Sequence, residues 1–441
     1  MGNYFAKPEP SPTQPTDEAD QAPQPDTVHE GSVEDQAAHH YADPEDIEEG
    51  KASYRPGGFH PVYIGDVFND RYKVLSKIGY GQYSTVWLVR DLQPSDDAKT
   101  VFRALKVLSA MCYGQGHDTF EKEILTHLRD GEESDKGYAH VCHLLDDFEH
   151  QGPNGTHTCL VFELMGETLA SFGVWFKEDM IPSLIMRRLA KQLVLALDFA
   201  HKRGVIHTDI KPDNIFVKFR DHSLIESGYL LEVPVPRQYR EEAQYCPLPS
   251  QTLRYHYFNE AQSTRVDEFE IALGDWGVSS WTTEHLCETI QPVVLRSPEV
   301  LIGAPWSAAT DWWNLGAVLL EVYRAVQMFD GRVPPDGHYE AGEHLFEVVD
   351  LFGPFPKALL EKGNRDIVGE LFDEEGHIKD AEPMERPGLV SEAFMPGLSP
   401  KSREEFGSFL MEMMKIDPEQ RPSAKDLLKH SWLETVEHEE K

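Results

Sequence analysis

The residues most able to do chemistry lie in one run of eight, at positions 207–214, which reads His-Thr-Asp-Ile-Lys-Pro-Asp-Asn. Asp209 carries a carboxylate that can accept the proton of an attacking hydroxyl. Lys211 can neutralise charge that develops on a transferred phosphoryl group, and the amide oxygen of Asn214 can hold a magnesium ion. Lys211 and Asn214 lie two and five positions after Asp209, so one short loop can bring all three groups to the same reaction centre. The run therefore favours phosphoryl transfer to a hydroxyl.

A second candidate metal ligand follows an apolar, strand-like stretch at 269–273. Asp275 lies in the turn Gly-Asp-Trp-Gly at 274–277, so its carboxylate would stand at the end of a strand between glycines. Such a turn is usually nothing more than a turn. Its place after Asn214 in the chain favours a magnesium ligand that bridges two phosphates of a nucleotide.

A glycine-containing hairpin is predicted from the alternation at 72–75 and 84–89. Gly79 and Gly81 in its turn would let backbone N–H groups approach phosphate oxygens. The hairpin alone is weak evidence, since Ser84 stands where a third glycine is usual. Lys106 strengthens the interpretation, because on the next predicted strand, 102–108, its ammonium could reach the α- and β-phosphates.

An ammonium that points into a phosphate site needs a carboxylate to hold it. The helix predicted at 119–129 offers Glu121 and Glu123. Glu123 directly precedes the apolar pair Ile124 and Leu125, which should face the sheet. The sequence therefore favours Glu123 as the partner of Lys106, with Glu121 as the alternative.

Two lobes must position these residues, since 441 residues exceed the usual size of a single core. Strands and one helix form the first lobe, and beyond the apolar run 159–165 the periodicity is mostly helical, at 184–203, 309–325, 344–351 and 401–415. The expected fold class is α+β, with a small β-rich lobe and a larger, mainly α lobe. The stretch 218–270 has no sustained period, which predicts a functional or disordered insert.

The charge of the chain restricts its partners. A net charge of −35 argues against binding of nucleic acid and favours cationic partners. Residues 1–55 hold 13 acidic and 3 basic side chains and few large apolar ones, which predicts a disordered acidic tail with either a solubilising or a regulatory role. A short charged tail is expected at 434–441.

The remaining composition favours an intracellular protein, cytoplasmic or nuclear. The five cysteines are scattered without the paired spacing of a zinc site, which fits a reducing compartment. No stretch approaches the roughly 18 apolar residues that cross a bilayer, so no membrane association is expected.

Together these motifs resemble the eukaryotic protein kinase pattern from Tyr72 to about Leu433, and later landmarks at 297–299, 311–313 and 417–422 agree. The resemblance implies a bilobal kinase fold, with a first lobe at 72–162, a hinge at 163–166 and a second lobe at 167–433. It implies ATP and Mg²⁺ as cofactors, with adenine held by hinge backbone. The nucleotide-binding residues would be Ile78, Gly79, Gly81, Val86, Ala104, Lys106, Glu123, Glu163, Met165 and Phe216.

The same resemblance assigns structural roles outside the nucleotide site. Glu299 and Arg421 would form a buried ion pair, and Asp311 would brace the catalytic loop. Lys211, two positions after the catalytic Asp209, favours serine or threonine over tyrosine as the acceptor.

One branch of the family fits best. The lead-in segment at 56–71 is similar to that of the SR-protein kinases, which phosphorylate serines in arginine-serine repeats of proteins such as splicing factors. Thr208 in place of the usual arginine, Trp281, and the run Glu-Val-Leu-Ile-Gly at 299–303 also fit. The resemblance implies a monomer that acts on cationic, Arg/Ser-rich proteins. Candidate groove residues, which suit a solvated face equally well, are Asp336, Glu340 and Glu343.

The chain also departs from that branch. Its insert at 218–270 is only about fifty residues, shorter than the family's spacer, and Trp276 replaces the usual Leu or Phe. Thr208 removes the arginine that receives an activation-loop phosphate, which predicts activity without such phosphorylation. The alternatives are a pseudokinase scaffold and a dual-specificity kinase, although the signature segment of the latter is absent at 343–350.

Overall fold

The computed structural model describes residues 48–93, 101–114, 119–219, 221–236, 238, 240, 245–257, 269–333, 337–379 and 387–434. All of them belong to one compact unit, Asp46–Lys441. The acidic tail up to residue 47 and the C-terminal tail from 435 lie outside the described residues.

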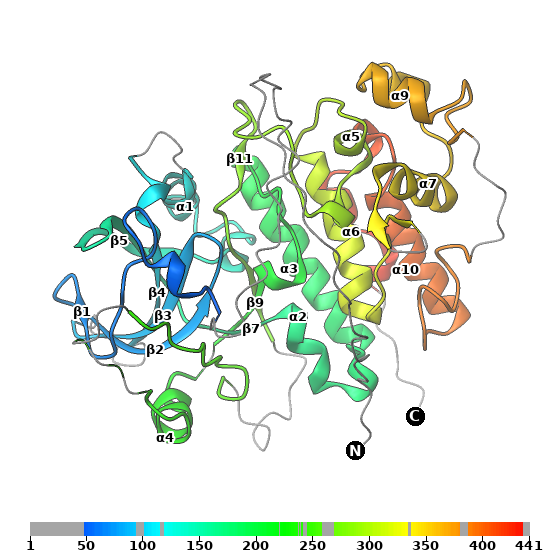
Figure 1. Cartoon of the computed structure of the whole chain (residues 1–441). Coiled ribbons are helices and arrows are strands. Elements are labelled where there is room, and N and C mark those ends of the chain that lie inside the picture. Colours follow the sequence, from blue (N-terminus) through cyan, green and yellow to red (C-terminus); the bar gives the residue numbers. More distant parts are fainter. Residues whose placement is uncertain are drawn as a thin grey trace, which may run out of the picture. The chain divides into compact units, whose positions relative to one another are not determined.

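The first lobe is built on a six-stranded antiparallel sheet with the strand order β1-β2-β3-β4-β6-β5 (Figure 1). Its strands are β1 (Val67–Phe68), β2 (Tyr72–Tyr80), β3 (Ser84–Asp91), β4 (Phe102–Leu108), β5 (Leu144–Gly152) and β6 (Gly155–Phe162). The predicted glycine hairpin is confirmed as β2 and β3, whose register pairs Tyr80 with Thr85. Alternate side chains of these strands, among them Val74, Trp87 and Val89, are buried in one cluster.

One helix, α1 (Glu121–Arg129), packs beside this sheet. Ile124, Leu125 and Leu128 are its buried apolar residues, and they recur with the spacing of one helical face. The described residues therefore contain the β-rich first lobe with one α-helix that the sequence predicts.

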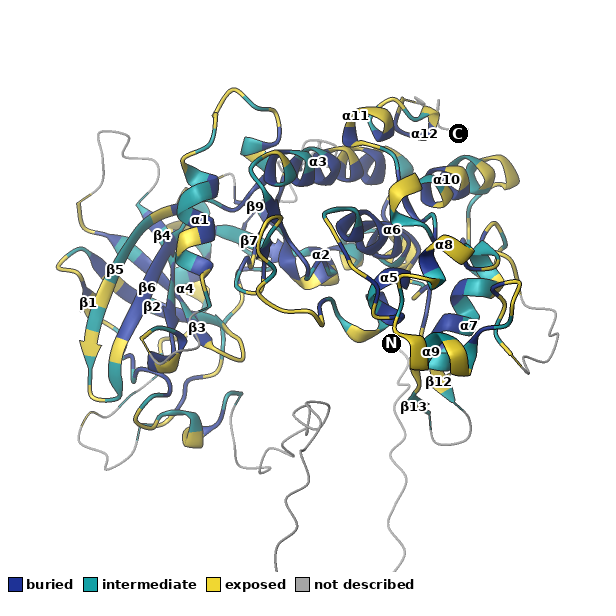
Figure 2. Ribbon diagram, turned by 90° about the horizontal axis from the view of Figure 1, so that it is seen from above, coloured by how far each residue is buried: buried dark blue, intermediate teal, exposed yellow. Residues whose placement is uncertain are grey.

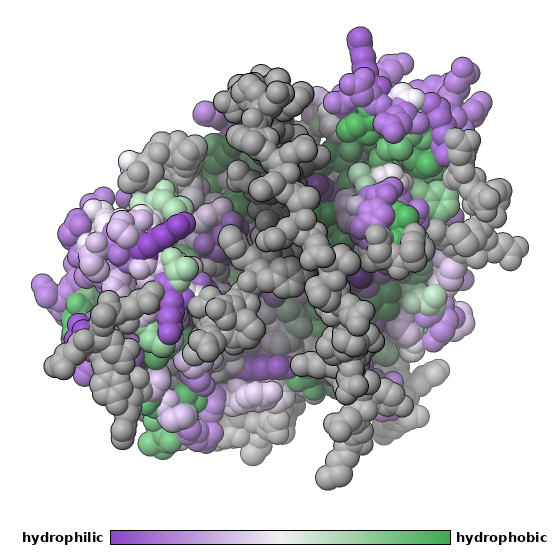
Figure 3. All heavy atoms as spheres, viewed as in Figure 1, coloured by the Kyte–Doolittle hydropathy of each residue, from purple (hydrophilic) through white to green (hydrophobic). Residues whose placement is uncertain are grey.

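The second lobe is mainly helical, and Figure 2 shows buried residues along both of its long helices, α3 and α6. Nearly every residue of α6 is buried. The helices are α2 (Leu169–Phe172), α3 (Ser183–Lys202), α5 (Pro298–Leu301), α6 (Ala309–Arg324), α7 (Ala341–Phe352), α8 (Lys357–Leu360), α9 (Arg365–Leu371), α10 (Pro400–Met413), α11 (Ala424–Leu427) and α12 (Ser431–Glu434). Figure 3 shows hydrophilic side chains gathered at the top right, over α9.

Small sheets carry the loops of interest in this lobe. One sheet has the order β10-β9-β7, and two further pairs are β8 with β11 and β12 with β13. Their bounds are β7 (Met165–Thr168), β8 (Val205–Ile206), β9 (Ile215–Lys218), β10 (Ile271–Leu273), β11 (Ser280–Trp281), β12 (Arg332–Val333) and β13 (His338–Tyr339). The last two residues of the predicted hinge at 163–166 thus begin β7. Among the described residues, none of the helices is long and apolar enough to cross a membrane.

The insert is an excursion between β9 and β10, closed where the Lys218 N–H donates to the Glu270 carbonyl. Its described part is folded. A π-helix (Ile225–Tyr229) continues into α4 (Leu230–Glu232), and Leu248 is buried in the core of the first-lobe sheet.

Residues 48–55, which the sequence assigns to the disordered tail, are likewise folded. They form a turn and a short 3-10 helix (Lys51–Ser53), and the Ser53 hydroxyl donates to the Glu49 carbonyl. The predicted boundary at 55 was wrong because long-range contacts of Glu48 and Glu49 fix the end of a segment whose composition alone favours disorder.

Candidate active site

The loop at 207–214 follows β8, and hydrogen bonds from its backbone to the buried helix α6 hold it in place. Asp311 accepts the backbone N–H groups of His207 at 2.9 Å and Thr208 at 3.0 Å, and it binds His201 Nε2 at 2.8 Å. Burial would raise the pKa of Asp311, but the hydrogen bond and positive charge of His201 outweigh it and hold the pKa below its usual value. The predicted brace of this loop is confirmed.

The three predicted chemical residues of the loop converge on one carboxylate. Lys211 Nζ lies 2.8 Å from Asp209 Oδ2, and Asn214 Nδ2 lies 2.8 Å from the same oxygen. Asn214 Nδ2 also donates to the Asp209 carbonyl. Two donors on one oxygen orient the carboxylate, and since the Asn214 nitrogen is used in this way, its amide oxygen is the atom available to a metal ion.

Lys106 on β4 is held by two carboxylates. Its Nζ lies 2.6 Å from Glu121 Oε1 on α1 and 3.1 Å from Asp275 Oδ1. Burial would lower the pKa of Lys106, but the two negative charges outweigh it and raise the pKa above its usual value. The Lys106 charge is in turn the main cause that lowers the pKa of Asp275, whereas burial raises the pKa of Glu121. Lys106 and Asp275 are therefore charged at neutral pH.

The prediction that Glu123 holds Lys106 is wrong. Glu123 is exposed, and its Oε2 accepts a hydrogen bond from the Tyr113 hydroxyl at 3.2 Å. Glu121 lies three and four residues before Ile124 and Leu125, which puts it on the buried face of α1, while Glu123 lies about 200° further around the helix. The helical spacing of the buried apolar residues, extended one turn towards the N-terminus, would have identified Glu121.

Substitution of Glu121 by Gln should test this assignment. We expect kcat/KM for phosphoryl transfer to fall about 10- to 100-fold, since a hydrogen bond between charged groups is worth about 1.5–3 kcal/mol. Glu123→Gln is the matched control on the same helix and should leave kcat/KM nearly unchanged. Steady-state kinetics of both variants decides, and a larger loss in Glu123→Gln would contradict the structure.

Asp275 stands at the end of β10 in a strained turn. Its φ is 57°, and the turn is fixed where the Gly274 N–H donates to the Asn214 carbonyl at 2.9 Å. His207 Nε2 binds the Gly274 carbonyl at 3.0 Å. These bonds bring the two predicted metal ligands, Asn214 and Asp275, to adjacent loops. Trp276 is fully buried, with its Nε1 donating to the Leu273 carbonyl, so its ring packs in the core.

The sheet register gathers the predicted nucleotide-binding residues around Lys106. Val86 on β3 pairs with Gly79 on one side and with Lys106 on the other. Ala104 pairs with Phe162 at the end of β6. The remaining predicted residues lie on neighbouring segments, with Ile78 on β2, Gly81 in the hairpin turn, Glu163 and Met165 at the hinge and Phe216 on β9.

The donor set fits a divalent cation together with a nucleotide. Among the described residues, no three His, Cys, Asp or Glu side chains lie close enough to bind a metal ion by themselves. Magnesium, however, takes one or two carboxylates and completes its shell with water and phosphate oxygens. Asp275 and Asn214 supply one carboxylate and one amide oxygen, and Lys106 supplies a cation for the phosphates.

Comparison with known proteins decides the family. The family model described as "Protein kinase domain" matches residues 72–228 and 260–433. The chain belongs to the protein kinase family. A crystal structure of a kinase domain shares the fold, with a TM-score of 0.59 and 20% identity, and it covers 84% of this chain and 98% of that one.

Several curated relatives of this kinase are named serine/threonine-protein kinases. It is 28% identical to a serine/threonine-protein kinase SRPK of Physarum polycephalum, over 88% of this chain and 92% of that protein. It is 31% identical to a serine/threonine protein kinase of Aspergillus fumigatus, over 88% and 90% of the two chains. It is 25% identical to human SRSF protein kinase 3, over 89% and 91%. The chain is therefore a serine/threonine protein kinase that resembles the SRPK group.

Membership of this family implies ATP and a divalent metal ion, which bring the transferable γ-phosphoryl group and offset its charge. In this kinase Lys106, Asn214 and Asp275 would hold them. Asp209, whose carboxylate is oriented by Lys211 and Asn214, would take the proton of the acceptor hydroxyl, and Lys211 beside it would offset charge on the phosphoryl group.

A buried ion pair joins Glu299 on α5 to Arg421, both in the second lobe of the kinase. Both side chains of the pair are fully buried, and the two Arg421–Glu299 contacts are 2.7 Å each. Arg421 Nε also donates to the Lys415 carbonyl. This is the pairing that the family resemblance implies.

Proposed function

We propose that this kinase phosphorylates serines that are flanked by arginine in basic segments of proteins, of the kind found in splicing factors. The observation that carries the proposal is an acidic cluster at the start of α7. Glu343 and Glu347 lie one turn apart on this helix, and Glu347 accepts the backbone N–H groups of Asp330 and Gly331 at 3.1 Å each. Glu340 directly precedes the helix.

The electrostatics of the cluster support a cationic ligand. Burial raises the pKa of Glu347 to about 7, and the neighbouring charges of Asp330 and Glu343 act in the same direction. The Glu347 carboxylate thus lies in the negative field of its neighbours, which an arginine side chain would relieve. The net charge of −35 would steer such a substrate towards the kinase. Asp336, the third groove residue that the sequence suggests, lies outside the described residues.

Charge reversal tests this substrate class. The double variant Glu340→Lys/Glu343→Lys should raise KM for an Arg-Ser repeat peptide about tenfold and leave kcat unchanged, since each reversal exchanges an attraction for a repulsion of up to about 1 kcal/mol. Glu149→Lys on β5 of the other lobe is the control for charge alone. If KM is unchanged in the double variant, these two residues do not bind the peptide.

We further propose that the kinase works without activation-loop phosphorylation. Thr208 is buried, its hydroxyl donates to the Val278 carbonyl at 2.8 Å, and its N–H binds Asp311. A neutral side chain that is satisfied in this way leaves no cation at position 208 to receive a phosphate. The Lys106–Glu121 pair is also formed in the unphosphorylated chain.

Treatment with phosphatase should therefore change turnover by less than about twofold. The purified kinase would be treated, freed of phosphatase and compared with a mock-treated sample in the peptide assay, with mass spectrometry to verify removal of phosphate. A large loss of kcat that returns after autophosphorylation would contradict the proposal.

A further inference from the structure

One segment of the insert, residues 245–257, connects the glycine hairpin to the hinge, and we call it the strap. It has no helix or strand of its own. One part of it contacts Lys77 on β2, two residues before Gly79, and another part contacts Glu167, just beyond the hinge. The strap thus joins two of the elements that enclose the nucleotide.

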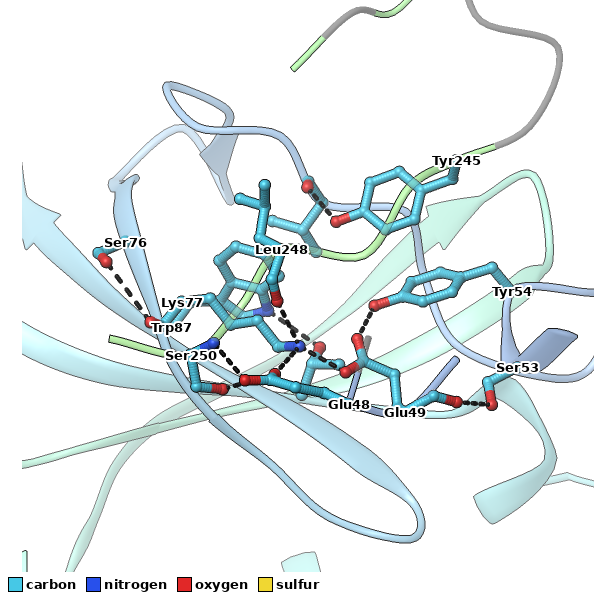
Figure 4. Close-up of polar contacts among 12 residues, drawn as sticks. Glu48, Glu49, Ser53, Tyr54, Ser76, Lys77, Trp87, Tyr245, Leu248 and Ser250 are labelled. Atoms are coloured by element: carbon cyan, nitrogen blue, oxygen red, sulfur yellow. Dashed lines mark hydrogen bonds and ion pairs between the residues drawn. The ribbon is translucent and has the colours of Figure 1, made fainter. Parts of the chain in front are cut away.

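At the hairpin end, Lys77 is fully buried among three acceptors from distant segments (Figure 4). Its Nζ lies 2.9 Å from the Leu248 carbonyl of the strap, 2.7 Å from Glu48 and 2.5 Å from Glu49. The Gln251 N–H of the strap donates to the Lys77 carbonyl at 2.8 Å. An ammonium has three protons, and all three have partners here, so its burial depends on these segments staying docked.

The two carboxylates connect the end of the acidic N-terminal segment to the same point. Glu48 also accepts the backbone N–H and the hydroxyl of Ser250, and the Tyr54 hydroxyl donates to Glu49, as Figure 4 shows. Burial would raise the pKa of Glu48, but the hydrogen bonds from Lys77 and Ser250 outweigh it and keep the pKa below its usual value. The Lys77 Nζ further lies 5.1 Å from the ring centroid of Tyr80, at the end of β2.

At the hinge end, the buried carboxylate of Glu167 takes hydrogen bonds from several side chains. The Tyr257 hydroxyl of the strap donates to it at 2.6 Å, Arg254 forms an ion pair with it at 3.5 Å, and Ser171 and Trp175 also donate. The Tyr257 ring lies directly on the hinge backbone, because a Cβ added to Gly166 would stand 2.4 Å from its Cγ atom.

The hairpin end of the strap has further anchors. Leu248 is buried in the sheet core with Val74 and Trp87. The Tyr229 hydroxyl, from the first helical turn of the insert, bonds both Ser76 of β2 and the Gln251 carbonyl at 2.8 Å. The chain between these anchors and Tyr257 spans few residues, so a shift of β2 relative to the hinge would have to break contacts at one end.

We propose that the strap, locked by Glu48 and Glu49, holds the glycine hairpin at a set distance from the hinge and so positions it over the nucleotide phosphates. Lys77 and Tyr257 are positioning residues, since they act through the backbone of β2 and of the hinge. The proposal rests on ATP binding between these elements. A purely stabilising strap would raise resistance to unfolding without a selective effect on ATP.

The test uses the full chain with Lys77→Met, which keeps the apolar stem and removes the charge. Lys73→Met, an exposed lysine on the same strand, is the matched control. We expect KM for ATP to rise about fivefold in Lys77→Met, while KM for the peptide and kcat change less than about twofold. An unchanged KM for ATP, or an equal rise in both KM values, would overturn the proposal. Activity of the wild-type chain in the same assay would show that the kinase assignment holds even if the strap proposal fails.

A double-variant cycle asks whether the two ends act through one connector. Tyr257→Phe removes the hydrogen bond to Glu167 and keeps the ring. If the strap links the hinge to the glycine hairpin, either single change already frees the hairpin. The double variant Lys77→Met/Tyr257→Phe should then raise KM for ATP by clearly less than the product of the two single effects. Multiplicative effects would show two independent sites and overturn the connector. Should Lys77→Met not fold, Glu49→Gln replaces it in the cycle, with the same expected directions.

Discussion

Replacement of Asp209 by Asn should lower kcat for peptide phosphorylation about 10²- to 10⁴-fold, the usual contribution of a positioned general base. The amide still offers an oxygen to Lys211 and Asn214, which now donate to Asp209 Oδ2, so the loop should keep its shape. It cannot accept the proton of the acceptor hydroxyl. The measurement is label transfer from ATP under saturating conditions.

The control is Asp198→Asn, at a partly buried carboxylate on α3 that forms an ion pair with Lys202. It should leave kcat unchanged. Binding of ATP to Asp209→Asn, measured by calorimetry, should also be retained, because the change affects the proton acceptor and not the phosphate cradle. If Asp209→Asn keeps wild-type kcat, another residue is the base and the assignment of the catalytic loop is wrong.

Removal of Arg421 should produce the largest loss of stability. Arg421→Met leaves the Glu299 carboxylate buried without its bidentate partner, and breaking a buried pair in this way costs about 3–5 kcal/mol. The measurement is the free energy of unfolding of the second lobe in denaturant. The matched control is Lys362→Met, which breaks the exposed Lys362–Glu419 pair and should leave the free energy of unfolding nearly unchanged, because solvent screens such a pair.

The double variant Glu299→Leu/Arg421→Met gives a further check on the cause. Removal of both charges should recover part of the lost free energy, since no unpaired charge then stays buried. Recovery should be incomplete, because Arg421 also donates to the Ala309 and Lys415 carbonyls. If Arg421→Met is as stable as Lys362→Met, the buried pair does not stabilise the second lobe.

Local signals in the sequence predicted much of the site. The loop at 207–214 carries its chemistry in eight consecutive residues, and the alternation around Gly79 and Gly81 defines a hairpin without tertiary information. The wrong choice of Glu123 over Glu121 also came from local sequence. It relied on the immediate neighbour of Ile124, whereas the periodicity of the helix places Glu121 on the buried face.

The strap could not be predicted by such reasoning. Its residues have no period, and its contacts join positions far apart in the chain, as between Lys77 and Leu248 or Glu167 and Tyr257. Glu48 and Glu49 have the same composition as the acidic segment before them. Their ion pairs with the buried ammonium of Lys77 could not be foreseen, because nothing in the sequence marks a lysine of a strand as buried.

The arrangement of the site also opposes the pseudokinase alternative. Lys106 is paired with Glu121 and Asp275, and Asp209 is oriented by Lys211 and Asn214. A scaffold without catalytic activity would not need both groups of residues, since the Lys–Glu pair and the Asp that would bind metal act in phosphoryl transfer.

The most direct test of the central claim is phosphorylation of an arrayed peptide library by the purified kinase with labelled ATP. We expect label on serine in peptides with adjacent arginines, loss of label when those arginines become alanine, and almost none with Asp209→Asn. Equal label on peptides without arginine would contradict the substrate class. Label on tyrosine, or none on any peptide, would contradict the assignment as a serine/threonine kinase.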